Sequence, residues 1–169
     1  MPEGSDNYQK LGNLWESDRL EVPSYQRRYS WKEEQIQDLI NDLDYVREED
    51  ARRDEDGEIV THYFGTIVLD HQGSADLPEM AGTTWKQMDI VDGQQRILSV
   101  TILIGLLVEL IENLAGELEE DQSEMAGRVG ESLEESYIED LNTRRTYISN
   151  DDDWNVFKSI VYDQRAPEE

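Results

Sequence analysis

The stretch Met88-Asp89-Ile90-Val91-Asp92-Gly93-Gln94-Gln95-Arg96 leads directly into a long apolar run over residues 97–118. This pattern predicts a short strand that ends at an Asp-Gly turn, followed at once by a long helix. The first backbone N–H groups of a helix lack partners within the helix, and the helix dipole leaves partial positive charge there, so a helix start attracts phosphate. We therefore expect this strand-to-helix turn to be the functional site.

Each residue of the turn suits a ligand that carries phosphate groups. Asp92 can cap the helix, and Gly93 lets a ligand approach the backbone closely because it has no side chain. Gln94 and Gln95 supply neutral donors and acceptors, and the planar guanidinium of Arg96 matches phosphate oxygens. The alternative is an ordinary helix cap with polar residues in its first turn.

A second candidate site is the loop Ser24-Tyr25-Gln26-Arg27-Arg28-Tyr29, which is rich in planar, hydrogen-bonding side chains. After it, Ser30 and Glu33 have the spacing of a capping box and predict a helix that starts at Trp31. The opposite side of this helix is acidic and should face water. The predicted apolar face comprises Ile36, Leu39, Ile40, Leu43 and Val46.

The other elements follow from hydrophobic periodicity and turn residues. Strands are expected over residues 19–22, 63–69 and 85–91, with the last two adjacent in a sheet. Loops are expected over residues 48–58 and 71–84, and the acidic region 116–136 should be a mobile loop or an exposed helix. The helix after the Asp-Gly turn should be central and largely buried, and a last helix should open at residues 149–152.

The charge of the chain is unusual, with 40 acidic against 15 basic residues and a formal net charge of −25. Such a charge repels nucleic acid and anionic membranes at long range, so a nucleic-acid role needs a local basic patch or a separate basic domain. Only four lysines occur beside eleven arginines. An acidic, lysine-poor surface fits a cytoplasm with molar salt, where screening removes most self-repulsion, and we expect a halophilic source.

Length and composition predict a single soluble domain over residues 1–169, with disordered ends at residues 1–10 and 163–169. The absence of cysteine excludes disulfides and thiolate metal sites. No signal peptide is visible, and polar residues interrupt the apolar run after the turn, so we expect a cytoplasmic protein that does not insert into a membrane. The sequence leaves open whether the domain forms an oligomer.

Three ordered motifs carry a family resemblance: residues 22–31, residues 63–69 and the Ile90-Val91-Asp92-Gly93-Gln94-Gln95-Arg96 stretch. Together they resemble the N-terminal domain of GmrSD-like proteins, which belong to type IV restriction and phage-defence systems. That domain is related to the ParB and sulfiredoxin nucleotide-binding fold. The resemblance therefore implies an α+β domain, a small mixed sheet packed with helices and followed by a helical C-terminal part.

The resemblance also implies that the Asp-Gly-Gln-Gln-Arg motif binds, and by extension hydrolyses, a nucleoside triphosphate with Mg²⁺. Gly93, Gln94, Gln95 and Arg96 would cradle the phosphates, and the loop residues Tyr25, Gln26 and Arg27 would close the site. Asp92 and Gln95 are the expected catalytic residues, with Asp92 orienting an attacking or Mg²⁺-bound water. The family commonly has a Thr-Thr pair after the motif, where this chain has Leu98-Ser99, which leaves a hydroxyl contact to phosphate to Ser99.

Members of the family typically continue into a nuclease domain that cuts DNA, and no such motif is visible here. DNA is thus expected to be contacted through a separate nuclease domain or subunit.

Two alternatives remain beside the hydrolysing regulatory domain. In one, the pocket is a sensor that binds a nucleotide or modified DNA without turnover. In the other, the loops are structural, and Arg27 and Arg96 pair with buried carboxylates such as Asp42 and Asp92.

Overall fold

The computed structural model describes residues 10–52, 62–76, 84–140 and 143–163. Its main sheet has the strand order β2-β3-β1-β6, formed by β1 (Asp18–Val22), β2 (Val68–Asp76), β3 (Thr84–Asp92) and β6 (Thr146–Ile148). Strand β1 runs parallel to β3 and β6, whereas β2 runs antiparallel to β3. The mixed sheet and its helices confirm the predicted α+β class.

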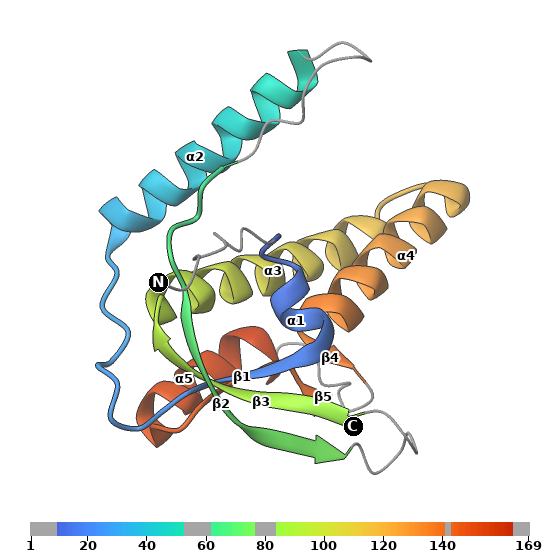
Figure 1. Ribbon diagram of the computed structural model, residues 1–169. Helices are drawn as coiled ribbons and strands as arrows, with labels where there is room; N and C mark the ends of the chain where they lie inside the picture. The colour runs from blue at the N-terminus through green and yellow to red at the C-terminus, as the bar shows by residue number, and fades with distance from the viewer. Residues whose placement is uncertain (1–9, 53–61, 77–83, 141–142, 164–169) are drawn as a thin grey trace.

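The helices of the described chain surround this sheet unevenly (Figure 1). They are α1 (Asn13–Ser17), α2 (Glu33–Arg52), α3 (Gln94–Ala115), α4 (Glu120–Tyr137) and α5 (Asp151–Val161). A short two-stranded sheet, β4 (Glu139–Asp140) with β5 (Thr143–Arg144), follows α4. Helices α3 and α4 lie side by side, while α2 projects away from the sheet. The residues buried most completely in the core include Trp15, Leu20, Ile90, Ile97, Ile138 and Val161.

The predicted strand-to-helix turn is confirmed. Strand β3 ends at Asp92 and α3 begins at Gln94, so one residue separates them. Ile90 on the strand and Ile97 on the helix are both fully buried, and they anchor the two sides of the turn in the same core. Burial of this kind stabilises by roughly 1.5–3 kcal/mol per large aliphatic side chain, which fixes the turn rigidly against the sheet.

The strand predicted over residues 63–69 lies further along the chain than expected. Residues 62–67 have no regular structure, and β2 begins at Val68 and continues to Asp76, inside the segment expected to be a loop. Two glycines explain the difference. Gly65 has φ +92°, which breaks the expected strand, and Gly73 has φ +145° beside a register shift that lets β2 stay paired with β3.

Helix α2 also departs from the expected start. It begins at Glu33 rather than Trp31. The backbone N–H groups of Ser30 and Trp31 both donate to Gln95 Oε1, whereas in a capping box the Ser30 N–H would donate to the Glu33 side chain. It continues through Arg52, so the loop expected from residue 48 is helical at its start, and residues 53–58 of that loop lie outside the described residues. Of its predicted apolar face, Leu39 is buried.

Helix α3 is only partly buried, which corrects the expectation that it is largely buried. Leu98 is 2% exposed, whereas Leu110 and Leu114 near its end are 53% and 47% exposed. Among the described helices, α3 is long and apolar enough to cross a bilayer by length and composition, a test that core helices of soluble proteins also pass. The first half of α3 therefore belongs to the core, while its second half buries Val108 and presents leucines at the surface.

The acidic region after α3 forms the exposed helix that was one of its two expected states, here α4. The last helix is confirmed as α5, where the Asn150 side chain caps the start by accepting from the N–H groups of Asp152 and Asp153. The predicted disorder at residues 1–10 and 163–169 falls, apart from Lys10 and Asp163, outside the described residues.

Candidate functional site

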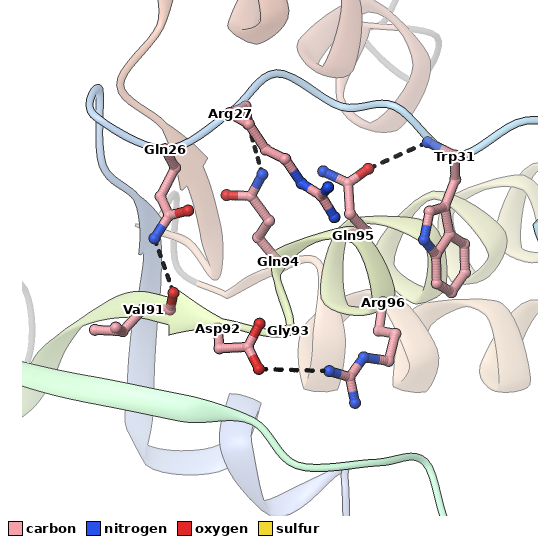
Figure 2. A pocket seen from close by; sticks show the side chains of 9 residues that line it. All are labelled: Gln26, Arg27, Trp31, Val91, Asp92, Gly93, Gln94, Gln95 and Arg96. Atoms are coloured by element: carbon pink, nitrogen blue, oxygen red, sulfur yellow. Dashed lines mark hydrogen bonds and ion pairs between the residues drawn. The ribbon is translucent and has the colours of Figure 1, made fainter.

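A pocket of about 320 Å³ opens where β3 meets α3 (Figure 2). This volume lies at the small end of the range of ligand pockets, roughly 300–1,000 Å³. One wall is the turn between strand and helix, and the facing wall is the segment after β1. The lining residues are Gln26, Arg27, Trp31, Val91, Asp92, Gly93, Gln94, Gln95 and Arg96.

The structure thus brings together most of the residues that the sequence pointed to. Seven of them line the pocket, and Tyr25 does not, since its side chain is 71% exposed and lies outside the lining. Trp31 and Val91 line the pocket although neither was predicted as a site residue. Trp31 was expected to begin a helix, and its actual place in an extended segment depends on tertiary hydrogen bonds that a local pattern does not show.

The start of α3 has no side-chain cap. Gly93 occupies the N-cap position with φ +93°, and no side chain accepts from the first N–H groups. The expectation that Asp92 caps the helix is therefore wrong: its carboxylate is 68% exposed and lies 3.9 Å from the Arg96 guanidinium. A β-carbon at position 93 would stand 3.0 Å from the Ile67 side chain, so glycine is required by contact as well as by conformation.

The two motif glutamines hold the facing segment through its backbone. Gln94 Nε2 donates to the Arg27 carbonyl at 2.5 Å. Gln95 Oε1 accepts from the N–H groups of Ser30 and Trp31 at 2.7 and 3.2 Å, and its Nε2 donates to the Arg28 carbonyl. Both side chains are about 95% buried, with 5% and 4% exposed. Their amides consequently join the two walls of the pocket.

One atom of this arrangement has no partner. Gln94 Oε1 is buried and accepts no hydrogen bond from any described residue. Because Gln94 Nε2 is committed to Arg27, the amide cannot rotate to relieve this without losing that bond. A buried acceptor left unpaired costs about 1–3 kcal/mol, so the wall of the pocket holds an unsatisfied hydrogen-bonding site.

Gln26 closes the end of the sheet. Its Nε2 lies 2.9 Å from the Val91 carbonyl and 3.3 Å from the Ile90 carbonyl, and donates to both. These carbonyls end β3 beside the turn, where regular pairing stops. Gln26 therefore anchors the loop to the strand, and the next residue, Arg27, is exposed at the pocket.

Arg96 connects the turn to the second motif of the resemblance. Its Nη1 donates to the Phe64 carbonyl at 3.1 Å. A β-carbon at Gly65 would lie 1.9 Å from that same Nη1, so the guanidinium occupies the space that any side chain would need. Residues 22–31, 63–69 and 90–96, far apart in the chain, are thus joined at one place by the side chains of the third motif.

The charge at the pocket is opposite in sign to that of the whole chain. Arg27 and Arg96 are its cations and Asp92 is its one carboxylate. The neighbouring Arg28 is engaged elsewhere, since its Nη2 lies 2.7 Å from Asp153, which raises the pKa of the guanidinium through hydrogen bonding and charge. An excess of positive charge in a chain of net charge −25 favours an anionic ligand here.

Two further expectations are settled by contacts. The Ser99 hydroxyl donates to the Gln95 carbonyl and lies 2.8 Å from the Tyr29 hydroxyl, so it faces the protein and not a phosphate.

The carboxylates proposed as partners of the arginines are exposed. Asp42 lies 3.6 Å from His62, and its side chain is 55% exposed. Since the Asp92 carboxylate is also exposed, the alternative in which the arginines satisfy buried carboxylates does not describe this site. Within the described ranges no three His, Asp or Glu side chains are placed to hold a metal ion.

Comparison with known families decides where the chain belongs. The family model described as the N-terminal domain of the GmrSD restriction endonuclease matches residues 10–169. The chain belongs to this GmrSD N-terminal domain family. No curated protein matches the chain. Membership of the GmrSD family assigns the domain to a restriction and defence protein, and it covers all three motifs that meet at the pocket.

Proposed function

We propose that this domain binds a nucleoside triphosphate in the pocket between β3 and α3 and hydrolyses it, and that the reaction regulates a DNA-cutting nuclease domain or subunit. One observation carries the proposal: the uncapped start of the 22-residue helix α3 opens into a pocket with two arginines, within a strongly acidic chain. Phosphate is the ligand chemistry that such a helix start and guanidinium pair attract.

The roles of the residues follow from their contacts. The first N–H groups of α3 and Arg96 would bind phosphate oxygens, and Arg27 would approach from the facing segment. Gln94 and Gln95 act as positioning residues in this scheme, because their amides hold the backbone of that segment. Asp92 is exposed at the pocket and can orient the water that attacks the terminal phosphorus, while the bridging oxygen leaves with the nucleoside diphosphate.

Mg²⁺ suits this residue set, because it is commonly held by nucleotide phosphates and one or two carboxylates, and it would neutralise charge on the transferred group. Asp92 is the carboxylate available at the pocket. We further propose that the fold is of the ParB and sulfiredoxin nucleotide-binding type and that the protein works in a cytoplasm with molar salt.

A second candidate function is a sensor that binds a nucleotide or modified DNA without hydrolysis. The lining residues include one carboxylate and no lysine, which favours a sensor. Enzymes of phosphoryl transfer commonly use a lysine and more metal-binding groups than this. The two functions share a binding step and differ in phosphate release.

Ligand-induced stabilisation tests the proposal. In molar KCl with Mg²⁺, one of ATP, GTP, CTP or UTP should raise the midpoint of thermal unfolding, because a ligand at a hundred times its Kd stabilises by about 2.7 kcal/mol. Arg96→Ala should abolish the shift. Arg128→Ala is the matched control, since Arg128 pairs with Glu124 on exposed α4 and does not line the pocket.

Phosphate release then separates the two functions. Release above the spontaneous rate, lost in Asp92→Asn, supports hydrolysis, and binding without release supports the sensor. A chain that no nucleotide stabilises, or an Arg96→Ala variant with unchanged affinity, would contradict the assignment of phosphate to this pocket.

A further inference from the structure

Helix α2 is an arm whose described neighbours hold it weakly. None of the described helices and strands packs extensively against it, and it projects away from the sheet (Figure 1). Residues 26–32 lead from the body into α2. Residues 62–67 belong to the return path and contact the strand-to-helix turn, where Phe64 accepts from Arg96 and Ile67 lies against Gly93. His62 lies 3.6 Å from Asp42, so the return segment also contacts the arm directly.

Three consecutive residues of the pocket hold both of these segments. Gln94 donates to Arg27 and Gln95 accepts from Trp31, which fixes the segment before α2. Arg96 donates to Phe64 in the segment after it. The same three side chains line the pocket (Figure 2). The pocket is thus built from the residues that set where the arm leaves the body.

We propose that occupation of the pocket moves helix α2, so that the arm reports whether the ligand is bound. This inference rests on the proposed function, because it requires an anionic ligand at Arg96. It concerns regulation by the site and not its chemistry.

The physical reason is that the domain with an empty pocket and the domain with a bound ligand differ in the contacts that hold α2. Arg96 now lies against Gly65 and donates to the Phe64 carbonyl, and a phosphate that draws the guanidinium toward the start of α3 weakens that hold. The segment before α2 contributes a second difference. Gln94 Oε1 has no partner in the present arrangement, and a displacement of residues 26–31 that admits a donor would satisfy it. A ligand shifts a two-state equilibrium by its differential affinity for the states, and the Arg96 contact provides one. A partner for Gln94 Oε1 would lower the free energy of the displaced state itself.

Helix geometry converts a rotation of the arm into a displacement that can be measured. Tyr45 is exposed and stands twelve residues beyond the start of α2, which places it about 18 Å along the helix. A rotation of about 15° at the start of the helix would displace Tyr45 by about 5 Å.

The absence of cysteine makes a distance measurement direct, because labels attach only where cysteines are introduced. Spin labels at Tyr45→Cys on α2 and Asn113→Cys on α3 report the arm. A second pair at Asn113→Cys and Val156→Cys, the latter on α5, reports the body, and all three positions are exposed. Each NTP is added with Mg²⁺ in molar KCl, and its binding to the labelled chain is measured separately by calorimetry.

Binding that shifts the distance between positions 45 and 113, by up to about 5 Å for a rotation of about 15°, while the distance between 113 and 156 stays constant, supports the proposal. Binding without a shift overturns it and leaves the proposed function standing. If no nucleotide binds, the proposed function fails, and the unliganded variants Gln95→Met and Arg96→Met decide whether the pocket residues set the arm. Those variants should broaden the distribution between 45 and 113, and Arg128→Met should not. An unchanged distribution in both would overturn the coupling as well.

Discussion

At Gly65 the backbone has φ +92°, and the Arg96 guanidinium occupies the place of a β-carbon. The residue therefore meets two requirements at once, a left-handed conformation and a close approach by a charged group. Phe64 and Gly65 thus hold the guanidinium in one place at the edge of the pocket. Residues 63–69, the second motif, thus position Arg96 of the third motif.

Gly65→Ala should lower the free energy of unfolding by about 1–3 kcal/mol, because alanine is strained at this φ and its β-carbon would overlap Arg96 Nη1. The variant should also weaken nucleotide binding, since Arg96 must move. Denaturant unfolding measures the first effect. Gly127→Ala in α4 is the control: nothing lies within 4 Å of the added carbon, and the change should stabilise by up to about 1 kcal/mol. Equal effects of the two substitutions would contradict the contact.

Asp89 lies between two other carboxylates across the sheet, opposite Glu21 on β1 and Asp70 on β2. Burial raises the pKa of its carboxyl, and the charges of Glu21 and Asp70 raise it further. A raised pKa means that the folded state binds the proton more tightly than the unfolded state does. Ionised Asp89 therefore opposes folding: stability falls as pH rises from about 3.8 through the folded pKa, and stays lower above it.

Asp89→Asn should consequently raise the free energy of unfolding at neutral pH by roughly 0.2–1 kcal/mol, the range typical of a cross-strand pair. The thermal unfolding midpoint should rise with it. The gain should shrink in molar salt and disappear at pH 3, where the native carboxyl is protonated. Thermal unfolding at pH 3 and pH 7 measures it. Glu131→Gln on exposed α4 is the comparison, and a gain at pH 3 equal to that at pH 7 would show that charge is not the cause.

At the scale of elements, the site depends on how two rigid units meet. Strand β3 and helix α3 share a core through Ile90 and Ile97, and the pocket forms because the single residue Gly93 turns the chain between them. Helix α5 contributes Phe157 and Val161 to the same core. Its start is capped by Asn150, in contrast to the uncapped start of α3. Helix α4 also starts without a side-chain cap, at Glu119, but it is the uncapped start of α3 that lines the pocket.

Asn150→Ala should destabilise the fold by about 1 kcal/mol, because it leaves the N–H groups of Asp152 and Asp153 without their acceptor. Asn150→Asp should keep the wild-type midpoint, since a carboxylate accepts the same bonds. Chemical unfolding followed by circular dichroism compares them. Equal losses in both variants would mean that the cap is not the source of the stability.

At the scale of the whole molecule, charge dominates. A net charge of −25 over one domain favours expansion at low ionic strength, where the Debye length is long. The same field leaves the pocket, with its two arginines, as a local exception that attracts anions at short range. Salt should therefore act oppositely on stability and on ligand binding.

Raising KCl from 0.1 to 2 M should increase the thermal midpoint of the unliganded domain, because screening removes repulsion among 40 acidic residues. Over the same range the affinity for a nucleotide should fall. Scanning calorimetry with and without ligand measures both trends. A midpoint that is highest at low salt would contradict the halophilic expectation.

Local chemistry was enough to locate the turn, the long helix after it and the opening of the last helix at residues 149–152, because each depends on residues within a few positions of one another. The α+β class followed from the family resemblance that the three motifs carry. The sequence could not reveal that Gly65 bends residues 62–67 away from the sheet, since the cause is Arg96, thirty-one residues further along.

Tertiary structure alone decided what the motif glutamines do. A pattern of polar residues at a helix start is compatible with binding a ligand, and their burial and their bonds to residues 27–31 appear only when the loop after β1 packs on α3. It also decided that α2 projects with Ile40 and Leu43 of its predicted apolar face exposed, although its periodicity predicts a packed helix. Periodicity specifies which residues share a face of a helix, and only the path of the connecting segments determines whether another element covers it.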